Sequence, residues 1–292
     1  AGAKACSFGR MFLFGLSVGG QEGVEKVLQN LHDEINRNMI LMGCKNLSEL
    51  NNSKLIYRKW EMKLAKNLER LGTESAFKIL AEAKKLEAEG KKIIHLSLGQ
   101  PDFRSPKHVI DATKKALDDG HHGYVLPNGI IECREAVTRK IKKLYNADID
   151  PERIIIMPGG KPTMYYAITL FGEPDAEIIY PDPGFPIYES MINYTGSTAI
   201  PYDLTEDKDL KFNPEKILSL ITKKTRLLIL INPNNPTGSF VEKSDIDVLA
   251  EGLKKHPHVT ILSDEIYSRQ IFDGKQMPSF FNYPELRERL IV

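Results

Sequence analysis

The sequence predicts an α/β fold in which a mainly parallel sheet carries helices on both faces. Two observations lead to this prediction. From about residue 150 onward, short apolar runs alternate with amphipathic helical segments, and several runs are apolar throughout rather than at every second position. Strands of that kind are buried on both faces, which is typical of parallel sheets covered by helices.

Composition favours a globular enzyme that acts on small molecules. The 292 residues are 41% hydrophobic and carry a formal net charge of +1. Charges of both signs are scattered along the chain, so neither a nucleic-acid nor a membrane partner is indicated. The apolar run at residues 11–20 is shorter than the ~20 residues that span a bilayer, and we expect it to be buried structure.

Cysteine usage points to a reducing compartment, and we expect a cytoplasmic protein. The three cysteines, Cys6, Cys44 and Cys133, are odd in number and widely spaced. They form no CxxC pair of the kind that holds zinc or performs redox chemistry, so no metal site is expected.

The chain divides into four stretches. Residues 1–50 combine a strand-like piece at 5–8 with a helix that has one apolar face, and residues 51–61 form a polar, aperiodic junction. Residues 62–95 begin like a natural amino terminus and contain a helix over about 73–89 that ends at Gly90. Residues 96–292 carry the alternating pattern. The apolar face of the first helix consists of Val24, Leu28, Leu31, Ile35, Met39 and Met42.

The sheet is expected to form from several of the apolar runs. Ligands of open α/β sheets bind beyond the carboxyl ends of the strands, so the residues after each run are the site candidates. Helices are expected at residues 163–171 and through 110–116. The expected strands are residues 154–157, 178–180, 227–231, 259–262 and 290–292, with a further extended run at 95–98.

Residues 158–162, Pro-Gly-Gly-Lys-Pro, follow the first of these runs and precede a helix. Glycines let backbone N–H groups turn toward an anion, the helix N-terminus adds partial positive charge, and Lys161 adds a full one. The motif therefore predicts a phosphate site at Gly159, Gly160 and Lys161. An ordinary glycine-rich turn with a solvated lysine is the alternative.

Residues 232–238, Asn-Pro-Asn-Asn-Pro-Thr-Gly, follow another run. The prolines fix the backbone, and asparagine amides can point into a cleft. A tight turn explains the proline and glycine but does not require the extra asparagines, which favours a binding loop.

Asp264 lies in Ser-Asp-Glu-Ile-Tyr, at the mouth of a run expected to be buried. Because burial of a carboxylate without a cationic partner is costly, Asp264 needs a positive group. A protonated heterocyclic nitrogen would serve, and helix capping is the alternative. Residues 99–103, Gly-Gln-Pro-Asp-Phe, leave structural and substrate-contacting roles equally open, with Asp102 and Ser105 as candidate caps for the next helix.

Six motifs occur in the order and approximate spacing of class I and II aminotransferases of fold type I. The region that contains them resembles the large domain of such an enzyme, a transferase of amino-acid metabolism that depends on pyridoxal 5′-phosphate. The motifs are residues 99–103, Gly123-Tyr124 with 127–129, Gly159-Gly160-Lys161, 181–185, 234–238 and 263–267.

This resemblance implies a role for each matching residue. Asp264 would pair with the pyridine nitrogen and keep it protonated, which lets the ring accept electrons from the substrate. Gly99 would lie against the substrate, and Tyr124 would reach the phosphate bound by the partner subunit of a homodimer. The remaining cofactor contacts would come from Gly159, Gly160 and Lys161 at the phosphate, Phe185 stacked on the ring, and Asn235 and Tyr267 at the ring oxygen.

The resemblance also implies a reaction, the transfer of an amino group from an amino acid to a 2-oxo acid. The family's Schiff-base lysine is absent from residues 1–292 and is expected just after Val292, while Lys275 does not sit in its context. We therefore expect the chain as written to be incomplete and inactive. The alternatives are a non-catalytic pyridoxal-phosphate-binding protein and a lyase or synthase of the same fold.

The first segment contains four short motifs, at residues 2–5 (Gly-Ala-Lys-Ala), 8–10 (Phe-Gly-Arg), 19–24 (Gly-Gly-Gln-Glu-Gly-Val) and 41–44 (Leu-Met-Gly-Cys). Through these motifs and their order, residues 1–50 resemble the closing strand and helix of an FMN-dependent α-hydroxy-acid oxidase or dehydrogenase barrel. In that family Gly9 and Arg10 would hold the FMN phosphate, here as a vestigial site, although Met11 replaces the usual proline. The chain opens on Ala1, so we interpret it as an artificial or mispredicted join between the tail of one gene and the head of the next at Met62. A genuine fusion is the alternative.

Overall fold

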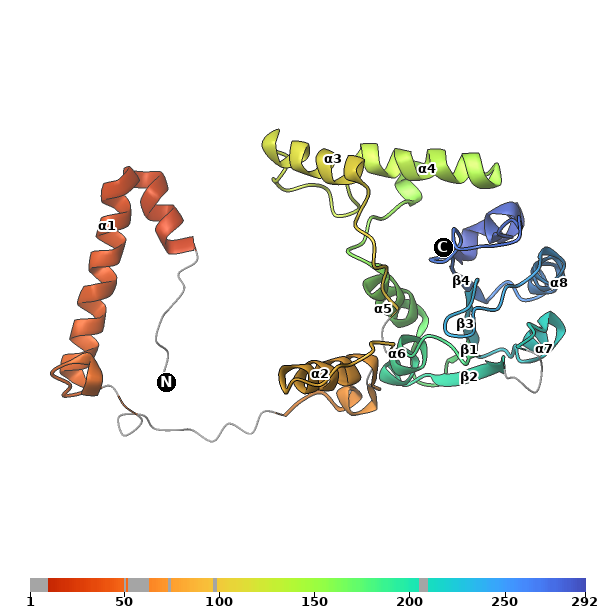
Figure 1. The fold of residues 1–292 in the computed structure, drawn as a ribbon, viewed down its shortest axis with the longest axis horizontal. Coiled ribbons are helices and arrows are strands. Elements are labelled where there is room, and N and C mark those ends of the chain that lie inside the picture. The colour runs from red at the N-terminus through yellow and green to blue at the C-terminus, as the bar shows by residue number, and fades with distance from the viewer. Residues whose placement is uncertain (1–9, 50, 52–62, 73–74, 97–98, 205–209) are drawn as a thin grey trace. The chain divides into compact units, whose positions relative to one another are not determined.

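A computed structural model describes residues 10–49, 51, 63–72, 75–96, 99–204 and 210–292 (Figure 1). The chain divides into two compact units, Ala1–Lys63 and Leu64–Val292. Within the described ranges no helix is long and apolar enough to cross a membrane. No cluster of three or more His, Cys, Asp or Glu side chains in those ranges could hold a metal ion.

The first unit is built on α1, Arg10–Leu41, which is two helices joined at a kink. Gly19 and Gly20 have non-helical backbone angles there, and Gly20 has φ of 57°. The two arms meet where Gly15 faces Gly23, because a Cβ on either glycine would collide with the backbone carbonyl of the other. The expected helix is confirmed, and a short 3-10 helix, η1 (Leu47–Glu49), follows it.

The expectation that residues 11–20 are buried is wrong for the side chains that the structure describes. Phe14 is exposed, and Val18 is 89% exposed. An apolar run signals burial only when a neighbouring surface covers it, and the described part of this unit supplies none over these side chains. The expected strand at residues 5–8 and the vestigial site residue Gly9 lie outside the described residues, as does the side chain of Arg10.

The second unit begins with an arm that contains the 3-10 helix η3 (Lys66–Arg70) and α2 (Ser75–Ala88). The helix expected at residues 73–89 is confirmed over residues 75–88, and residues 73 and 74 lie outside the described residues. It ends at Gly90, whose φ of 86° suits glycine and whose N–H donates to the Glu87 carbonyl.

The sheet of the second unit has the order β2-β1-β3-β4-β5 in the described residues, and every neighbouring pair is parallel. The runs at 178–180, 227–231, 259–262 and 290–292 all appear in it as expected. The strands are β1 (Glu177–Asp182), β2 (Thr198–Asp203), β3 (Thr225–Ile231), β4 (Thr260–Asp264) and β5 (Leu290–Ile291).

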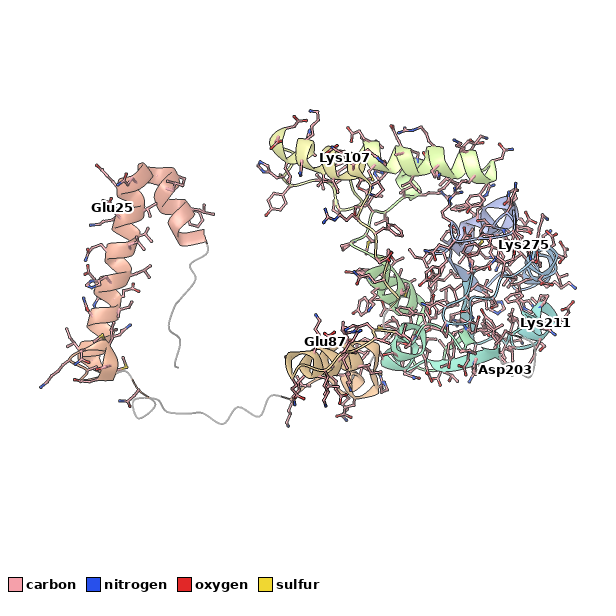
Figure 2. All side chains as sticks on the ribbon, in the orientation of Figure 1. Glu25, Glu87, Lys107, Asp203, Lys211 and Lys275 are labelled. Carbon is pink, nitrogen blue, oxygen red and sulfur yellow. The ribbon has the colours of Figure 1, made fainter. Side chains whose placement is uncertain are left out.

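Sequence reasoning missed β2, which is an edge strand. Its sequence contains Pro201, which cannot donate a backbone hydrogen bond and is tolerated only at an edge. Asp203, labelled in Figure 2, closes β2 and accepts a hydrogen bond from Lys216 Nζ at 3.1 Å.

Two expected extended runs do not join the sheet. Residues 154–157 form no strand, and Ile155 is 64% exposed. The Ile156 N–H donates to the Asn128 carbonyl at 3.1 Å instead of to a strand. In the run at 95–98, the described residues 95 and 96 are not in a strand either.

Helices cover both faces of the sheet, which confirms the expected architecture. Leu228 and Leu230 of β3 pack with α7 and α8, whereas Leu227 and Ile229 pack with α5 and α6. This division follows from the alternation of side chains along a strand. The helices are α3 (Lys107–Asp118), α4 (Ile131–Tyr145), η4 (Pro151–Arg153), α5 (Gly160–Phe171), α6 (Ile187–Thr195), α7 (Pro214–Ser219), α8 (Lys243–Leu253), η6 (Phe280–Asn282) and η7 (Pro284–Arg289).

Helix α3 has the expected position but not the expected cap. Its N-cap residue is Pro106, and no side chain accepts a hydrogen bond there. Asp102 and Ser105 therefore do not cap α3, because the helix begins one residue too late for Ser105 to stand at the N-cap.

Replacement of Tyr202 is expected to change how stability responds to alkaline pH. This tyrosine is buried, its hydroxyl donates to the Ile229 carbonyl at 3.3 Å, and burial raises its pKa. A raised folded-state pKa gives stability that is complete below the unfolded pKa of about 10 and is lost as pH rises above it. Denaturant unfolding of Tyr202→Phe should show a smaller loss of unfolding free energy between neutral and alkaline pH than the wild type.

The matched control for this prediction is Tyr165→Phe, because Tyr165 is exposed on α5. Its unfolding free energy should fall with pH as steeply as that of the wild type. The same slope in Tyr202→Phe would show that ionisation of this buried phenol does not contribute to alkaline unfolding.

Candidate functional site

The carboxyl ends of β1, β3 and β4 lie side by side, and the loops that follow them carry the candidate residues. Ile231, the last residue of β3, is in register with Asp264, the last residue of β4. The next backbone N–H, that of Asn232, donates to the Asp264 carbonyl at 3.2 Å. Strand pairing therefore sets Asp264 beside the asparagine-rich loop.

Asp264 is half-buried, and both of its carboxylate oxygens accept hydrogen bonds from neutral donors. The Tyr188 hydroxyl donates to Oδ2 at 2.6 Å, and the Ile266 N–H donates to Oδ1 at 3.2 Å. No lysine, arginine or histidine of the described ranges forms an ion pair with it. The alternative that Asp264 caps a helix is wrong, because the residues after it form a turn and not a helix. Its side chain accepts a backbone hydrogen bond within that turn.

Tyr188 was missed by sequence reasoning, although it lies three residues after Phe185. It stands in the first turn of α6 and is fully buried. Burial raises the pKa of its hydroxyl, and the nearby Asp264 carboxylate raises it further. The phenol therefore stays protonated at neutral pH and acts as a donor that holds Asp264 in place.

The sequence resemblance implies pyridoxal phosphate as the cofactor. Tyr188→Phe is expected to weaken the binding of this cofactor by roughly three- to tenfold. The change removes one hydrogen bond from the carboxylate, a loss of about 0.5–1.5 kcal/mol, while the buried ring remains. An absorbance titration of the cofactor would measure the affinity. Tyr194→Phe, on the same helix, is the control, and equal affinities in both variants would contradict the role of the Tyr188 hydroxyl.

The asparagines of the loop after β3 divide into two groups. Asn235 Nδ2 donates to the Tyr267 hydroxyl at 3.1 Å, which joins this loop to the turn after β4. Asn232 instead exchanges two hydrogen bonds with the backbone of Val241, and Asn234 Nδ2 donates to the Pro183 carbonyl at 3.2 Å. The extra asparagines therefore do have a structural use, which the sequence interpretation had not recognised.

The glycine-rich motif opens α5. Gly159 is the N-cap with φ of 98°, and no side chain caps the helix. Lys161 Nζ lies 5.9 Å from the centre of the Phe185 ring, which in turn meets the Tyr188 ring edge-on at 6.1 Å. A chain of contacts thus runs from the start of α5 to Asp264.

The structure brings several of the candidate residues together and leaves two apart. Phe185 and Tyr267 pack against the same buried cluster, which includes Tyr188 and Leu262. Tyr124, by contrast, is fully exposed, and in the described structure a Cβ added at Gly99 would meet no atom within 4 Å.

A cavity of about 300 Å³ lies elsewhere, between the arm and α6. Arg70 Nη2 donates to the Tyr194 carbonyl there, and the Gly72 N–H donates to Ser190 Oγ, both at 2.9 Å. None of the residues around Asp264 lines this cavity, which separates it from the candidate site.

Both parts of the chain match models of known protein families. Residues 91–290 match the family model "Aminotransferase class I and II", and residues 1–57 match the model "FMN-dependent dehydrogenase". The second match confirms the resemblance of the first segment.

Individual relatives agree with the first match. The chain is 31% identical to aspartate aminotransferase of Bacillus subtilis over 79% of this chain and 59% of that protein. It is 38% identical to a probable aspartate aminotransferase of Methanocaldococcus jannaschii over 62% and 48%, respectively. The structure of aspartate aminotransferase from Thermus thermophilus with maleate aligns with a TM-score of 0.73 at 28% identity, over 78% of this chain and 59% of that one.

The chain spans less than two thirds of the length of these relatives. The family match nevertheless covers most of the second unit, including the sheet and the loops that carry Phe185, Asn235 and Asp264. The chain therefore belongs to the class I and II aminotransferase family.

Proposed function

We propose that this chain supplies the cofactor-binding domain of a pyridoxal-phosphate-dependent aminotransferase, which transfers an amino group from an amino acid to a 2-oxo acid. The observation that carries the proposal is the Asp264 carboxylate. It stands at the end of a buried strand, with neutral donors on both oxygens, beside the Asn235–Tyr267 pair.

The residues present fit pyridoxal phosphate at its two charged ends. A partly buried carboxylate with only neutral donors is stabilised by a cationic N–H, and a protonated pyridine nitrogen provides one. At the other end, α5 begins without a side-chain cap, so its first N–H groups and Lys161 suit a phosphate. Phe185, between these two ends in the chain of contacts, offers an aromatic face for the ring.

Each residue would then do a defined task. When bound, the cofactor supplies an electron sink for the substrate's α-carbon. Asp264 holds a proton on the ring nitrogen, and Tyr188 keeps the carboxylate oriented. Asn235 and Tyr267 would bind the ring oxygen, while Gly159, Gly160 and Lys161 would anchor the phosphate.

The proposal extends to substrates and partners. Gly99 would contact the substrate, and the exposed Tyr124 would reach the phosphate site of a second subunit, so the enzyme would be a homodimer. The names of relatives include aspartate, an amino acid, and prephenate, a 2-oxo acid, which supports an amino-acid donor and a 2-oxo-acid acceptor. The cytoplasmic location stays a prediction.

The fourfold division of the chain into residues 1–50, 51–61, 62–95 and 96–292 is part of the same proposal. The FMN-dependent dehydrogenase match ends at residue 57, and the aminotransferase match begins at residue 91. Both limits support a change of origin between them.

The test is a product analysis with the protein purified from its natural source. It would be supplied with pyridoxal phosphate, an amino acid and a 2-oxo acid, and the products separated by chromatography. We expect the new amino acid and the new 2-oxo acid in equal amounts, without free ammonia. Ammonia release would indicate a lyase, and bound cofactor without turnover would indicate a binding protein, and either would overturn the proposal.

A further inference from the structure

Glu265, the residue after Asp264, has a carboxylate that accepts three side-chain hydrogen bonds. Ser279 Oγ and Ser263 Oγ donate to Oε1 at 2.7 Å and 3.1 Å. The Tyr145 hydroxyl donates to Oε2 at 3.3 Å. The three donors come from β4, from the segment that leads into η6, and from the last residue of α4, so one carboxylate joins three parts of the fold.

These donors are all neutral, and two of them are well buried. Ser279 is 1% exposed and Ser263 is 5% exposed. No ion pair with Glu265 occurs in the described part of the chain. Burial raises the pKa of Glu265, although its hydrogen bonds oppose that shift, and burial likewise raises the pKa of Tyr145 to about 12. The fold thus holds a carboxylate at a place where a neutral side chain would be easier to bury.

The parts that Glu265 joins are also tied to one another. The Tyr145 ring stacks on Phe281 at 5.7 Å, and Asn282 Nδ2 donates to the Tyr145 carbonyl at 2.9 Å. The end of α4 and η6 are therefore held together by direct contacts, and the Glu265 side chain is hydrogen-bonded to both segments.

The backbone of Glu265 connects the two candidate cofactor residues of this strand end. Asp264 precedes Glu265 in the chain. The Glu265 carbonyl accepts a hydrogen bond from the Ser268 N–H at 2.9 Å, within the turn that carries Tyr267. The hydrogen bonds of the Glu265 side chain fix the start of this turn. The orientations of the Asp264 and Tyr267 side chains therefore depend on these hydrogen bonds.

We propose that Glu265 is a positioning residue for the cofactor site, whose partly buried carboxylate holds Asp264 and Tyr267 in the geometry that binds the pyridine ring. The inference rests on the proposed function. A simpler role would be stabilisation of the fold, and the two roles differ in what a neutral replacement should change.

The test compares Glu265→Gln with the wild type in the full chain. Glutamine keeps the size of the side chain but replaces one acceptor oxygen by a donor, which disturbs the pattern of three incoming hydroxyls. We expect the dissociation constant for pyridoxal phosphate to rise about tenfold, equivalent to the misplacement of one hydrogen bond. The absorption maximum of the bound cofactor should shift, whereas the melting temperature of the cofactor-free protein should not fall.

Two milder variants and one control complete the experiment. Ser279→Ala and Tyr145→Phe each remove one donor and should move affinity and spectrum in the same direction by a smaller factor. Glu288→Gln is the matched control, because this exposed glutamate pairs with Arg153 and not with Tyr145, Ser263 or Ser279, so the change should alter neither.

A lower melting temperature with unchanged affinity and spectrum in Glu265→Gln would overturn the inference and leave only a structural role. In that case the wild type still binds the cofactor, so the proposed function stands. Absence of saturable binding by the wild type would instead remove the proposed function and this inference together.

Discussion

Asp264→Asn is expected to weaken pyridoxal-phosphate binding by ~10- to 100-fold, the largest effect of any single change at the site. Asparagine keeps the shape of the side chain but removes the negative charge, so a hydrogen bond between ions becomes one to a neutral amide. Bonds to charged groups contribute about 1.5–3 kcal/mol, which corresponds to this range. A spectroscopic titration of the cofactor would measure the loss.

Asp182→Asn provides the matched control, since this aspartate closes the nearby strand β1 and its side chain is exposed. Its cofactor affinity should equal that of the wild type. If the two variants lost affinity equally, a general disturbance of the strand ends would explain the loss better than a specific partner for the ring nitrogen.

Leu228→Ala is expected to lower the free energy of unfolding by about 2–5 kcal/mol, the range measured for large-to-small changes in protein cores. Leu228 lies in the middle of β3 and is 0% exposed. It packs in the cluster that holds α7 and α8 against the sheet. Its loss leaves a cavity that the surrounding strands cannot fill. Denaturant unfolding would measure the change.

The same substitution at Leu117 is the control, because that side chain is 59% exposed on α3. Leu117→Ala should change the unfolding free energy by no more than about 0.5 kcal/mol. Equal losses at both positions would contradict the assignment of the core to the sheet and its covering helices.

The central part of the fold could be predicted from the sequence because its strands contain buried apolar runs. Residues 227–231 in β3 and 261–262 in β4 are such runs, and both strands were expected. β2 was missed because an edge strand is only partly buried, and its Pro201 reads as a strand breaker. Residues 154–157 were wrongly assigned to a strand because they are apolar. An apolar run alone does not show whether the run pairs with other strands.

Part of the candidate site could be proposed from chemistry alone. A carboxylate at the mouth of a buried strand needs a cationic partner or a capping role, which made Asp264 a candidate. Tyr188 was not identified, because a tyrosine near the start of a helix is also an ordinary core residue. Its spacing of three from Phe185 was the available signal, and only the fold shows that it reaches Asp264. The tasks of the individual cofactor contacts came from family resemblance and not from spacing.

Helix α1 shows what periodicity can and cannot predict. Apolar residues three and four apart between Val24 and Met42 correctly predicted a helix, which ends at Leu41, one residue before Met42. The same spacing does not report burial: Leu28 and Ile35 of this apolar face are exposed within the described structure. Helical spacing reports the shape of one element, whereas burial depends on the surfaces that surround it.

The pairing of Asp264 with the pyridine nitrogen can be measured most directly by ¹⁵N NMR of pyridoxal phosphate labelled at that nitrogen. We expect the wild-type complex to give the chemical shift of a protonated pyridine at neutral pH, and Asp264→Asn to give that of an unprotonated one. The same chemical shift in both complexes would contradict the assignment of Asp264 as the residue that keeps the ring nitrogen protonated.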